Sequence, residues 1–163
     1  MSKTVLKNEQ DIRDFVRGCT LLGTGGGGLE ENGIESLMSE LSAGHEIAWI
    51  DADDVSDNAI TACTFLMGSI APHNQDTIAE MDTYGLNDST SVYKEKDRLV
   101  QAVGELEQFA QKKIEAIVPI ELGGANTPAG VATAAACGII AVDGDYTGRA
   151  IPEIQQTTPY LKG

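Results

Sequence analysis

Four consecutive glycines stand in the segment Leu22-Gly23-Thr24-Gly25-Gly26-Gly27-Gly28, near the start of a chain of 163 residues. Glycine loses more conformational entropy on ordering than any other residue. An ordered glycine run therefore indicates positive φ angles or a close approach of the backbone to a partner. The amides of such a loop suit a carbonyl, a carboxylate or a developing oxyanion. We interpret six of these residues as a ligand-binding loop, with a flexible tether as the alternative. They are Gly23, Thr24, Gly25, Gly26, Gly27 and Gly28.

Two nucleotide-binding motifs resemble this segment in letters only. The spacing Gly23-x-Gly25-x-x-Gly28 matches the dinucleotide fingerprint, but that fingerprint requires a strand before it, and here an amphipathic helical pattern precedes the glycines. A phosphate-binding P-loop needs a lysine after its glycines, whereas Leu29, Glu30 and Glu31 follow here. The sequence therefore disfavours both cofactors and leaves the cofactor unassigned.

Polar residues also follow two apolar segments late in the chain, and each segment is typical of a buried strand. Parallel strands end at a common edge of their sheet, so we expect these residues and the glycine loop to meet in one cavity. The residues are Glu121, Gly123, Gly124 and Asn126 around the end of 114–122, and Asp143, Asp145, Arg149 and Glu153 after 139–142. Among them we assign ligand binding to Gly123, Gly124, Asn126 and Glu153.

The catalytic candidates are Glu121, Asp143, Asp145 and Arg149. A carboxylate at a strand end can take a proton from water, and partial burial makes it a better base. Two neighbouring aspartates push their pKa values apart, and an arginine can hold developing negative charge. The alternatives are structural: an ion pair between Asp143 and Arg149 that fixes the last loop, and Asn126 as a helix cap.

Cysteines and histidines give a weaker signal. Cys19, Cys63 and Cys137 are odd in number, lack a CxxC pair and lie in apolar surroundings, so we expect buried reduced thiols. A nucleophilic cysteine would need His45 or His73 as its base. Two histidines at this spacing do not predict a metal site, and we assign no metal ligands.

The composition limits the classes of partner. The net charge is −14, and from residue 18 to residue 93 there are thirteen acidic residues and no lysine or arginine. Such a surface repels phosphate backbones and anionic lipid, so we expect neither nucleic acid nor a membrane as partner. The N-terminal residues turn polar at once and lack the apolar core of a signal peptide, which predicts a cytoplasmic protein.

The elements that must position these residues alternate between helix and strand. Short connections between them predict a single α/β domain over 1–163, a three-layer αβα fold with a mostly parallel sheet. Apolar spacing predicts helices over 8–22, 34–41, 94–112 and 126–137, the last ended by Gly138, and strands over 46–50, 59–67, 114–122 and 139–142. Loops are expected over 68–74 and 83–93, and residues 151–163 have too little hydrophobic pattern to complete a fold alone.

Three separated motifs resemble one family. They are the glycine segment 22–28, the sequence Pro119-Ile120-Glu121-Leu122-Gly123-Gly124-Ala125-Asn126, and the stretch from Val142 to Gln155. Together they resemble the N-terminal domain of the S-methyl thiohydantoin desulfurase family over about residues 11–158. The resemblance implies a second, β-rich domain, so a chain that stops at Gly163 is expected to be a split-gene subunit or an excised fragment. Residues 68–72 depart from the family's tighter Gly-Ala-Pro.

The family name implies that water replaces a methylthio group on a five-membered ring, giving a hydantoin and methanethiol. The function expected from this resemblance is a hydrolase-like domain that acts on a cyclic amide or thiohydantoin-type heterocycle. The alternative is a non-catalytic, metabolite-binding subunit. Under either function, the expected partners of the protein are the heterocycle, a chain that carries the β-rich domain, and further copies of itself in a homo-oligomer.

Overall fold

A computed structural model describes residues 3–68, 74–86 and 95–163 of the chain. His73 lies outside the described residues, as do most of the loop expected over 83–93 and part of the one expected over 68–74. Within the described residues, no helix is both long enough and apolar enough to cross a membrane.

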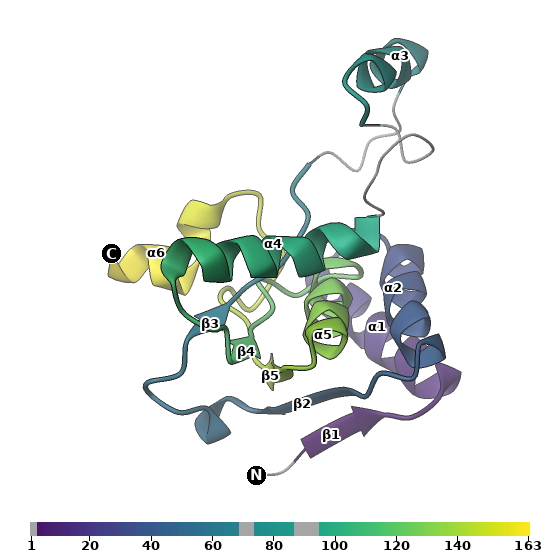
Figure 1. Cartoon of the computed structure of the whole chain (residues 1–163). Helices are drawn as coiled ribbons and strands as arrows, with labels where there is room; N and C mark the ends of the chain where they lie inside the picture. The colour runs from purple at the N-terminus through teal and green to yellow at the C-terminus, as the bar shows by residue number, and fades with distance from the viewer. Residues whose placement is uncertain (1–2, 69–73, 87–94) are drawn as a thin grey trace.

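A five-stranded sheet forms the centre of the fold, in the order β1-β2-β5-β4-β3 (Figure 1). The edge strand β1 pairs with β2 antiparallel, and the other three pairings are parallel. The sheet is therefore mostly parallel, as the sequence predicts. The strands are β1 (Lys3–Leu6), β2 (Ile47–Asp51), β3 (Thr61–Ala62), β4 (Ala116–Ile117) and β5 (Ile140–Asp143).

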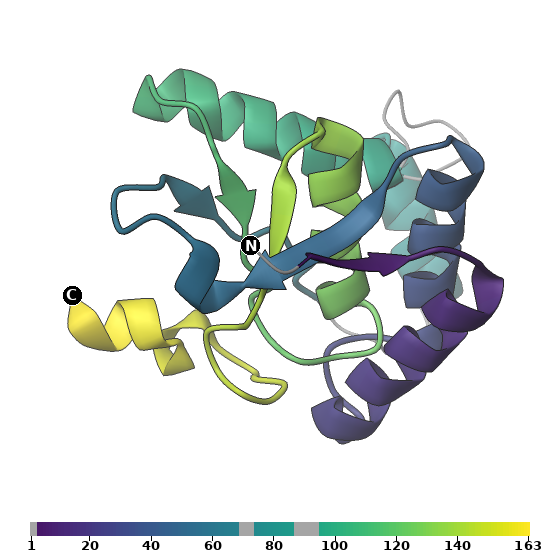
Figure 2. The ribbon, with the colours of Figure 1, turned by 90° about the horizontal axis from the view of Figure 1, so that it is seen from below.

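Six helices accompany the sheet in the described residues, and the architecture is α/β, consistent with the predicted three-layer αβα fold. They are α1 (Glu9–Gly23), α2 (Glu30–Ser42), α3 (Gln75–Thr83), α4 (Glu95–Ala110), α5 (Asn126–Cys137) and α6 (Thr158–Lys162). Figure 2 looks onto the sheet, with α5 behind β2 and β5. The chain passes through short 3₁₀ turns at Ala52–Asp54 and Ile154–Gln156.

Helix α1 begins and ends where its sequence predicts. The side chain of Asn8 accepts a hydrogen bond from the Asp11 amide at 3.0 Å, which is a standard N-cap. Ile12 and Val16 lie one turn apart on the same face and are fully buried in the core. The helix ends at Thr24, whose φ of 52° is in the left-handed region.

Helix α5 occupies the middle of the domain. It packs against β2, β4 and β5 and against α2 and α4. Its sequence consists largely of alanine, glycine, threonine and valine, so these neighbours can approach its backbone closely. Gly138 ends the helix with a φ of 66°, which confirms the predicted stop.

Several element bounds differ from expectation. The apolar segments 59–67 and 114–122 contain only two-residue strands, β3 and β4, and the apolar residues after each strand lie outside the sheet pairing. Helix α2 begins at Glu30, four residues before its apolar face starts. The short edge strand β1 and the helices α3 and α6 have too few apolar residues to show a periodic signal.

Candidate functional site

The glycine loop packs backbone against backbone on the turn that follows β4. A Cβ atom added to Gly27 would lie 2.4 Å from Cα of Gly123, and one added to Gly23 would lie 2.9 Å from the same atom. The carbonyl of Gly27 accepts hydrogen bonds from the amides of Ala125 and Asn126, both at 2.9 Å. A backbone carbonyl of the loop is therefore the hydrogen-bond acceptor for the amides at the start of α5.

Other glycines of the two segments are needed for the same close packing. A Cβ atom on Gly26 would meet Cβ of Ala150 at 2.5 Å, and one on Gly124 would meet the carbonyl oxygen of Gly28 at 2.9 Å. Gly25 differs, because it has a φ of 94° and open space around it. Most of the glycine run is thus explained by interior contacts, whereas Gly27 and Gly28 also line a cavity.

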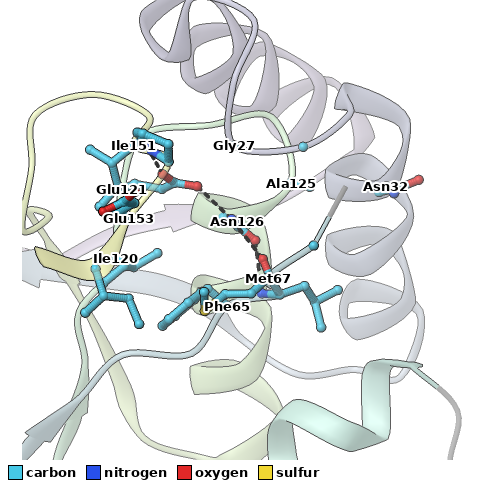
Figure 3. A pocket seen from close by; sticks show the side chains of 15 residues that line it. Gly27, Asn32, Phe65, Met67, Ile120, Glu121, Ala125, Asn126, Ile151 and Glu153 are labelled. Carbon is cyan, nitrogen blue, oxygen red and sulfur yellow. Dashed lines mark hydrogen bonds between the residues drawn. The ribbon is translucent and has the colours of Figure 1, made fainter. Parts of the chain in front are cut away.

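The first cavity has a volume of about 320 Å³ and opens where β3 and β4 end (Figure 3). Its walls come from four segments that are distant in sequence. They are the glycine loop with the start of α2 (Gly27, Gly28 and Asn32), residues 65–68 after β3, the exit of β4 with the start of α5 (Ile120, Glu121, Ala125 and Asn126), and residues 151–154. This is the carboxyl edge of the parallel strands, where ligands bind in α/β sheets.

A buried carboxylate lies at the centre of this cavity wall. Glu121 is only 5% exposed. Its Oε1 accepts a hydrogen bond from Nδ2 of Asn126 at 2.7 Å, and its Oε2 accepts one from the amide of Ile151 at 2.7 Å. Oδ1 of Asn126 in turn accepts from the amide of Leu66 at 3.2 Å. The network joins three of the walls, as the dashed lines in Figure 3 show.

The alternative role of Asn126 as a helix cap is wrong. Asn126 is the first residue of α5, and the preceding Ala125 occupies the cap position without a side-chain hydrogen bond. The side chain of Asn126 instead bonds Glu121 and Leu66, while the carbonyl of Gly27 accepts from the backbone amides of Ala125 and Asn126.

The charge of the first cavity is negative. Its lining contains the buried Glu121 and the exposed Glu153, together with the amides of Asn32 and Asn126, and no lysine, arginine or histidine among the described residues. Within the part of the chain that the structure describes, the amides of Gly27 and Gly28 donate no hydrogen bond. The cavity therefore offers carboxylate acceptors to a ligand, and two residues in its wall have backbone amides without an acceptor among the described residues.

Asp143 and Asp145 line a second cavity of about 480 Å³, which the first does not include. The expectation that all the candidate residues meet in one cavity is therefore wrong. Asp145 accepts hydrogen bonds from the amide of Thr147 at 2.7 Å and from the amide of Gly148, so its carboxylate orders the turn after β5.

Arg149 lies in neither cavity lining. Its side chain is exposed, and Nε donates to the carbonyl of Ala150 at 3.0 Å. Among the described residues it forms no ion pair, so the alternative of a pair with Asp143 is also wrong. Six of the predicted ligand-binding residues likewise line neither cavity: Gly23, Thr24, Gly25, Gly26, Gly123 and Gly124.

The first cavity also contains residues that the sequence analysis does not single out. Phe65, Leu66 and Met67 belong to the apolar segment expected to be strand throughout, and Ile151 contributes a backbone amide that no side-chain pattern reveals. If the strand had been predicted to end at Ala62, Phe65, Leu66 and Met67 would have been recognised as residues that follow a strand end. Asn32, on the first turn of α2, carries no sequence signal.

The thiols are protonated at neutral pH. Burial raises the pKa of Cys19 to about 11, and burial also raises the pKa values of Cys63 and Cys137. A reactive cysteine would need a lowered pKa. His45 hydrogen bonds Glu40 through Nδ1 at 2.6 Å. Among the described residues, no group of three histidine, cysteine or acidic side chains could hold a metal ion.

The fold and the cavities define a class of protein: an α/β domain that presents ligand-sized cavities at the carboxyl edge of a mostly parallel sheet. The chain belongs to the S-Me-THD-like, N-terminal domain family, whose model matches residues 10–163. This confirms the resemblance seen in the sequence. No curated protein gives a significant match.

A solved structure has the same fold. It is the X-ray crystal structure of a protein from Chromobacterium violaceum, 20% identical to this chain, with a TM-score of 0.62. The match covers 97% of this chain and 38% of the other. The chain therefore spans well under half the length of the solved protein that it matches.

Proposed function

We propose that the first cavity binds a small, uncharged cyclic amide or thiohydantoin-type heterocycle and assists the attack of water on it. The observation that carries this proposal is the buried carboxylate of Glu121 in the cavity wall. Each of its oxygens accepts one hydrogen bond from the protein, and a carboxylate oxygen can accept more than one. Membership of the family supports the class of heterocycle.

The charge of the lining favours a neutral ligand. Two carboxylates, Glu121 and Glu153, repel an anion such as oxoproline, and the lining has no cationic side chain to offset them. A ring N–H suits the free acceptor sites of Glu121. The amides of Gly27 and Gly28 suit a ring oxygen or the negative charge that develops during attack.

For an S-methyl thiohydantoin, the proposed reaction balances with water alone. The water oxygen bonds to the ring carbon that carries the methylthio group, and Glu121 takes one proton from it. The carbon–sulfur bond then breaks, and methanethiol leaves with one of the two water protons. The other proton remains on the ring nitrogen, which gives the hydantoin. Asn126 and the Ile151 amide hold the carboxylate in place.

A second candidate function is binding without catalysis, with a further domain or partner chain supplying the missing group. The lack of any lysine, arginine or histidine in the described lining favours it, because no side chain other than a carboxyl could protonate the leaving sulfur. The matched solved protein is much longer than this chain. Under this proposal its additional part corresponds to the β-rich partner, and a homo-oligomer remains a prediction.

The experiment is a calorimetric titration with hydantoin, S-methyl thiohydantoin and oxoproline. We expect the first two to bind and the anionic oxoproline to bind at least about tenfold more weakly. Glu121→Gln should abolish binding, whereas the control Glu105→Gln, on the exposed side of α4, should not change it. Circular dichroism must first show that both variants are folded. Equal binding by wild type and Glu121→Gln would refute the site.

Methanethiol release separates the two candidates. Turnover of S-methyl thiohydantoin by the chain alone would support the hydrolase. Binding without release, also after addition of a candidate partner chain, would refute the hydrolase and support the binding subunit.

A further inference from the structure

The second cavity has a composition unlike that of the first. It lies where β2 and β5 end, and its volume of about 480 Å³ is in the range of small-molecule sites. Its inner wall is apolar and includes Phe15, Leu22, Trp49 and Val131. The lining has no lysine, arginine or histidine among the described residues. The charged side chains that the described lining contains are all carboxylates.

An aromatic pair forms part of the wall. Phe15 of α1 and Trp49 of β2 are stacked, with ring centroids 4.9 Å apart and an angle of 30° between the ring planes. Both rings are partly exposed. The face of an aromatic ring attracts an organic cation, and tryptophan does so most strongly. The stack is formed by the protein's own packing, so a ligand would meet it preorganised.

Three carboxylates lie at the rim, and their hydrogen bonding differs. Oδ1 of Asp14 accepts from Nε2 of Gln10 at 2.9 Å, and Asp145 accepts from the turn that it orders. Asp143 is exposed, and within the described residues it has no hydrogen-bond or ionic partner. It stands at the end of β5, in register with Asp51 at the end of β2.

We propose that this cavity is a second binding site, for an amphipathic organic ammonium: an amine whose charged group meets Asp143 and whose apolar body lies against Phe15 and Trp49. The two halves of such a ligand match the two halves of the cavity. An anion is repelled by three carboxylates, and a small inorganic cation would leave the apolar wall in water. The site is independent of the heterocycle site proposed for the first cavity.

The test uses three probes of nearly equal size: phenethylammonium, 2-phenylethanol and phenylacetate. Trp49 is the chain's only tryptophan and lines this cavity, so its fluorescence reports binding directly. We expect the ammonium to bind about tenfold more tightly than the alcohol, the combined effect of one exposed ion pair and one cation–π contact. Phenylacetate should not bind measurably.

Variants assign the two halves of the site. Asp143→Asn should lower ammonium affinity towards that of the alcohol, with the cation–π part of the preference retained, and should leave alcohol affinity unchanged. The control Asp57→Asn, an exposed aspartate before β3, should change neither. Phe15→Leu should weaken both probes. Glu121→Gln should not alter ammonium binding, which separates this result from the fate of the first site. The proposal would be overturned by equal affinity for the ammonium and the alcohol, or by no binding of either probe. It would also be overturned if Asp143→Asn bound the ammonium as tightly as the wild type does.

Discussion

The two cavities lie on the same edge of one sheet and differ in almost every other respect. The first has a buried carboxylate held by two hydrogen bonds, and the second has an apolar wall with carboxylates at its rim. Adjacent residues divide between them, because Glu121 lines the first cavity and Leu122 lines the second. Pro119, just before the bend at residues 120 and 121, also lines the second cavity. One strand exit therefore supplies two unlike sites.

What the cavities share is a contact between two backbones. Gly23 and Gly27 pack on Gly123, while Leu22 lines the second cavity and Gly27 the first. Glycine allows this close approach because it has no Cβ atom. The glycine run thus acts first as a structural contact beside both cavities and only at Gly27 and Gly28 as the wall of one. Changes to the shared contact should affect both sites, and changes elsewhere only one.

The largest effect is expected from Gly33→Ala in α2. Its new Cβ would lie 2.0 Å from the carbonyl oxygen of Gly124 and 2.8 Å from Cγ of Pro128. The first of these is a backbone atom that cannot move without displacing the turn. We expect a loss of about 3 kcal/mol or more in the free energy of unfolding, and loss of binding at both cavities. Urea denaturation followed by circular dichroism measures the first quantity.

The matched control is Gly104→Ala, which is also a substitution inside a helix, but whose new Cβ has no described atom within 4 Å apart from the backbone around it in its own helix. It should stabilise the protein by up to about 1 kcal/mol through helix propensity alone. If Gly33→Ala were as stable as Gly104→Ala, the close packing of α2 on the glycine turn would be incorrect.

The second prediction concerns pH and the inner wall of the second cavity. Cys19 lines this cavity, and burial raises the pKa of its thiol from 9.0 to about 11. A raised pKa in the folded state gives stability that is complete below pH 9 and is lost as the pH rises towards 11. This loss should amount to about 2 kcal/mol.

Cys19→Ser removes the titration, so urea denaturation between pH 8 and 11 should show a shallower decline for this variant than for the wild type. Serine changes the baseline stability as well, and only the slope with pH is compared. Parallel slopes would mean that water reaches the thiol and that the second cavity is more open than its burial indicates.

The third prediction sharpens the hydrogen-bond network of the first cavity. Asn126→Ala removes the donor to Oε1 of Glu121 and the acceptor for the Leu66 amide. We expect a loss of about 1–2 kcal/mol in stability, together with weaker heterocycle binding. Ammonium binding in the second cavity should stay the same. The exposed Asn58→Ala serves as control and should lie within about 0.5 kcal/mol of the wild type. If Asn126→Ala bound the heterocycle as tightly as the wild type, the hydrogen-bond network would not contribute to binding in the first cavity.

Much of the fold could be predicted because its signals are local. The cap at Asn8, the apolar spacing of Ile12 and Val16 and the stop at Gly138 each depend on residues within one or two turns. The order of strand and helix follows from the same kind of signal. Strand β1 could not be predicted in this way, since its four residues gain their structure from pairing with β2, far along the chain.

The sequence predicts on which edge of the sheet the candidate site lies, but not which residues share a cavity. Strand ends locate Glu121 and Asp143 on that edge, but their separation into two cavities depends on how each exit turns, which is a tertiary property. Asn126 illustrates the same limit. Its position before Pro128 suggests a cap, yet α5 already begins at Asn126, and the Asn126 side chain bonds Glu121 and Leu66, which lie on other segments.

The smallest effect is expected from Arg149→Ala, and it is informative because Arg149 stands in the segment that joins the two sites. Asp145 lines the second cavity and Ile151 the first, whereas Arg149 between them lines neither. The one hydrogen bond of its side chain in the described residues goes to the neighbouring carbonyl of Ala150. A lone exposed side chain of this kind contributes little to stability, so the variant should unfold within about 0.5 kcal/mol of the wild type.

A catalytic role for Arg149 would show itself in binding and turnover rather than in stability. If the guanidinium holds the charge that develops on the heterocycle, Arg149→Ala should lower methanethiol release while Arg149→Lys keeps part of it. The control Arg17→Ala removes an exposed cation on α1, so it has the same net charge as Arg149→Ala. Equal loss in both alanine variants would reflect net charge alone. No loss in Arg149→Ala would leave Glu121 and the loop amides as the groups that act in the first cavity.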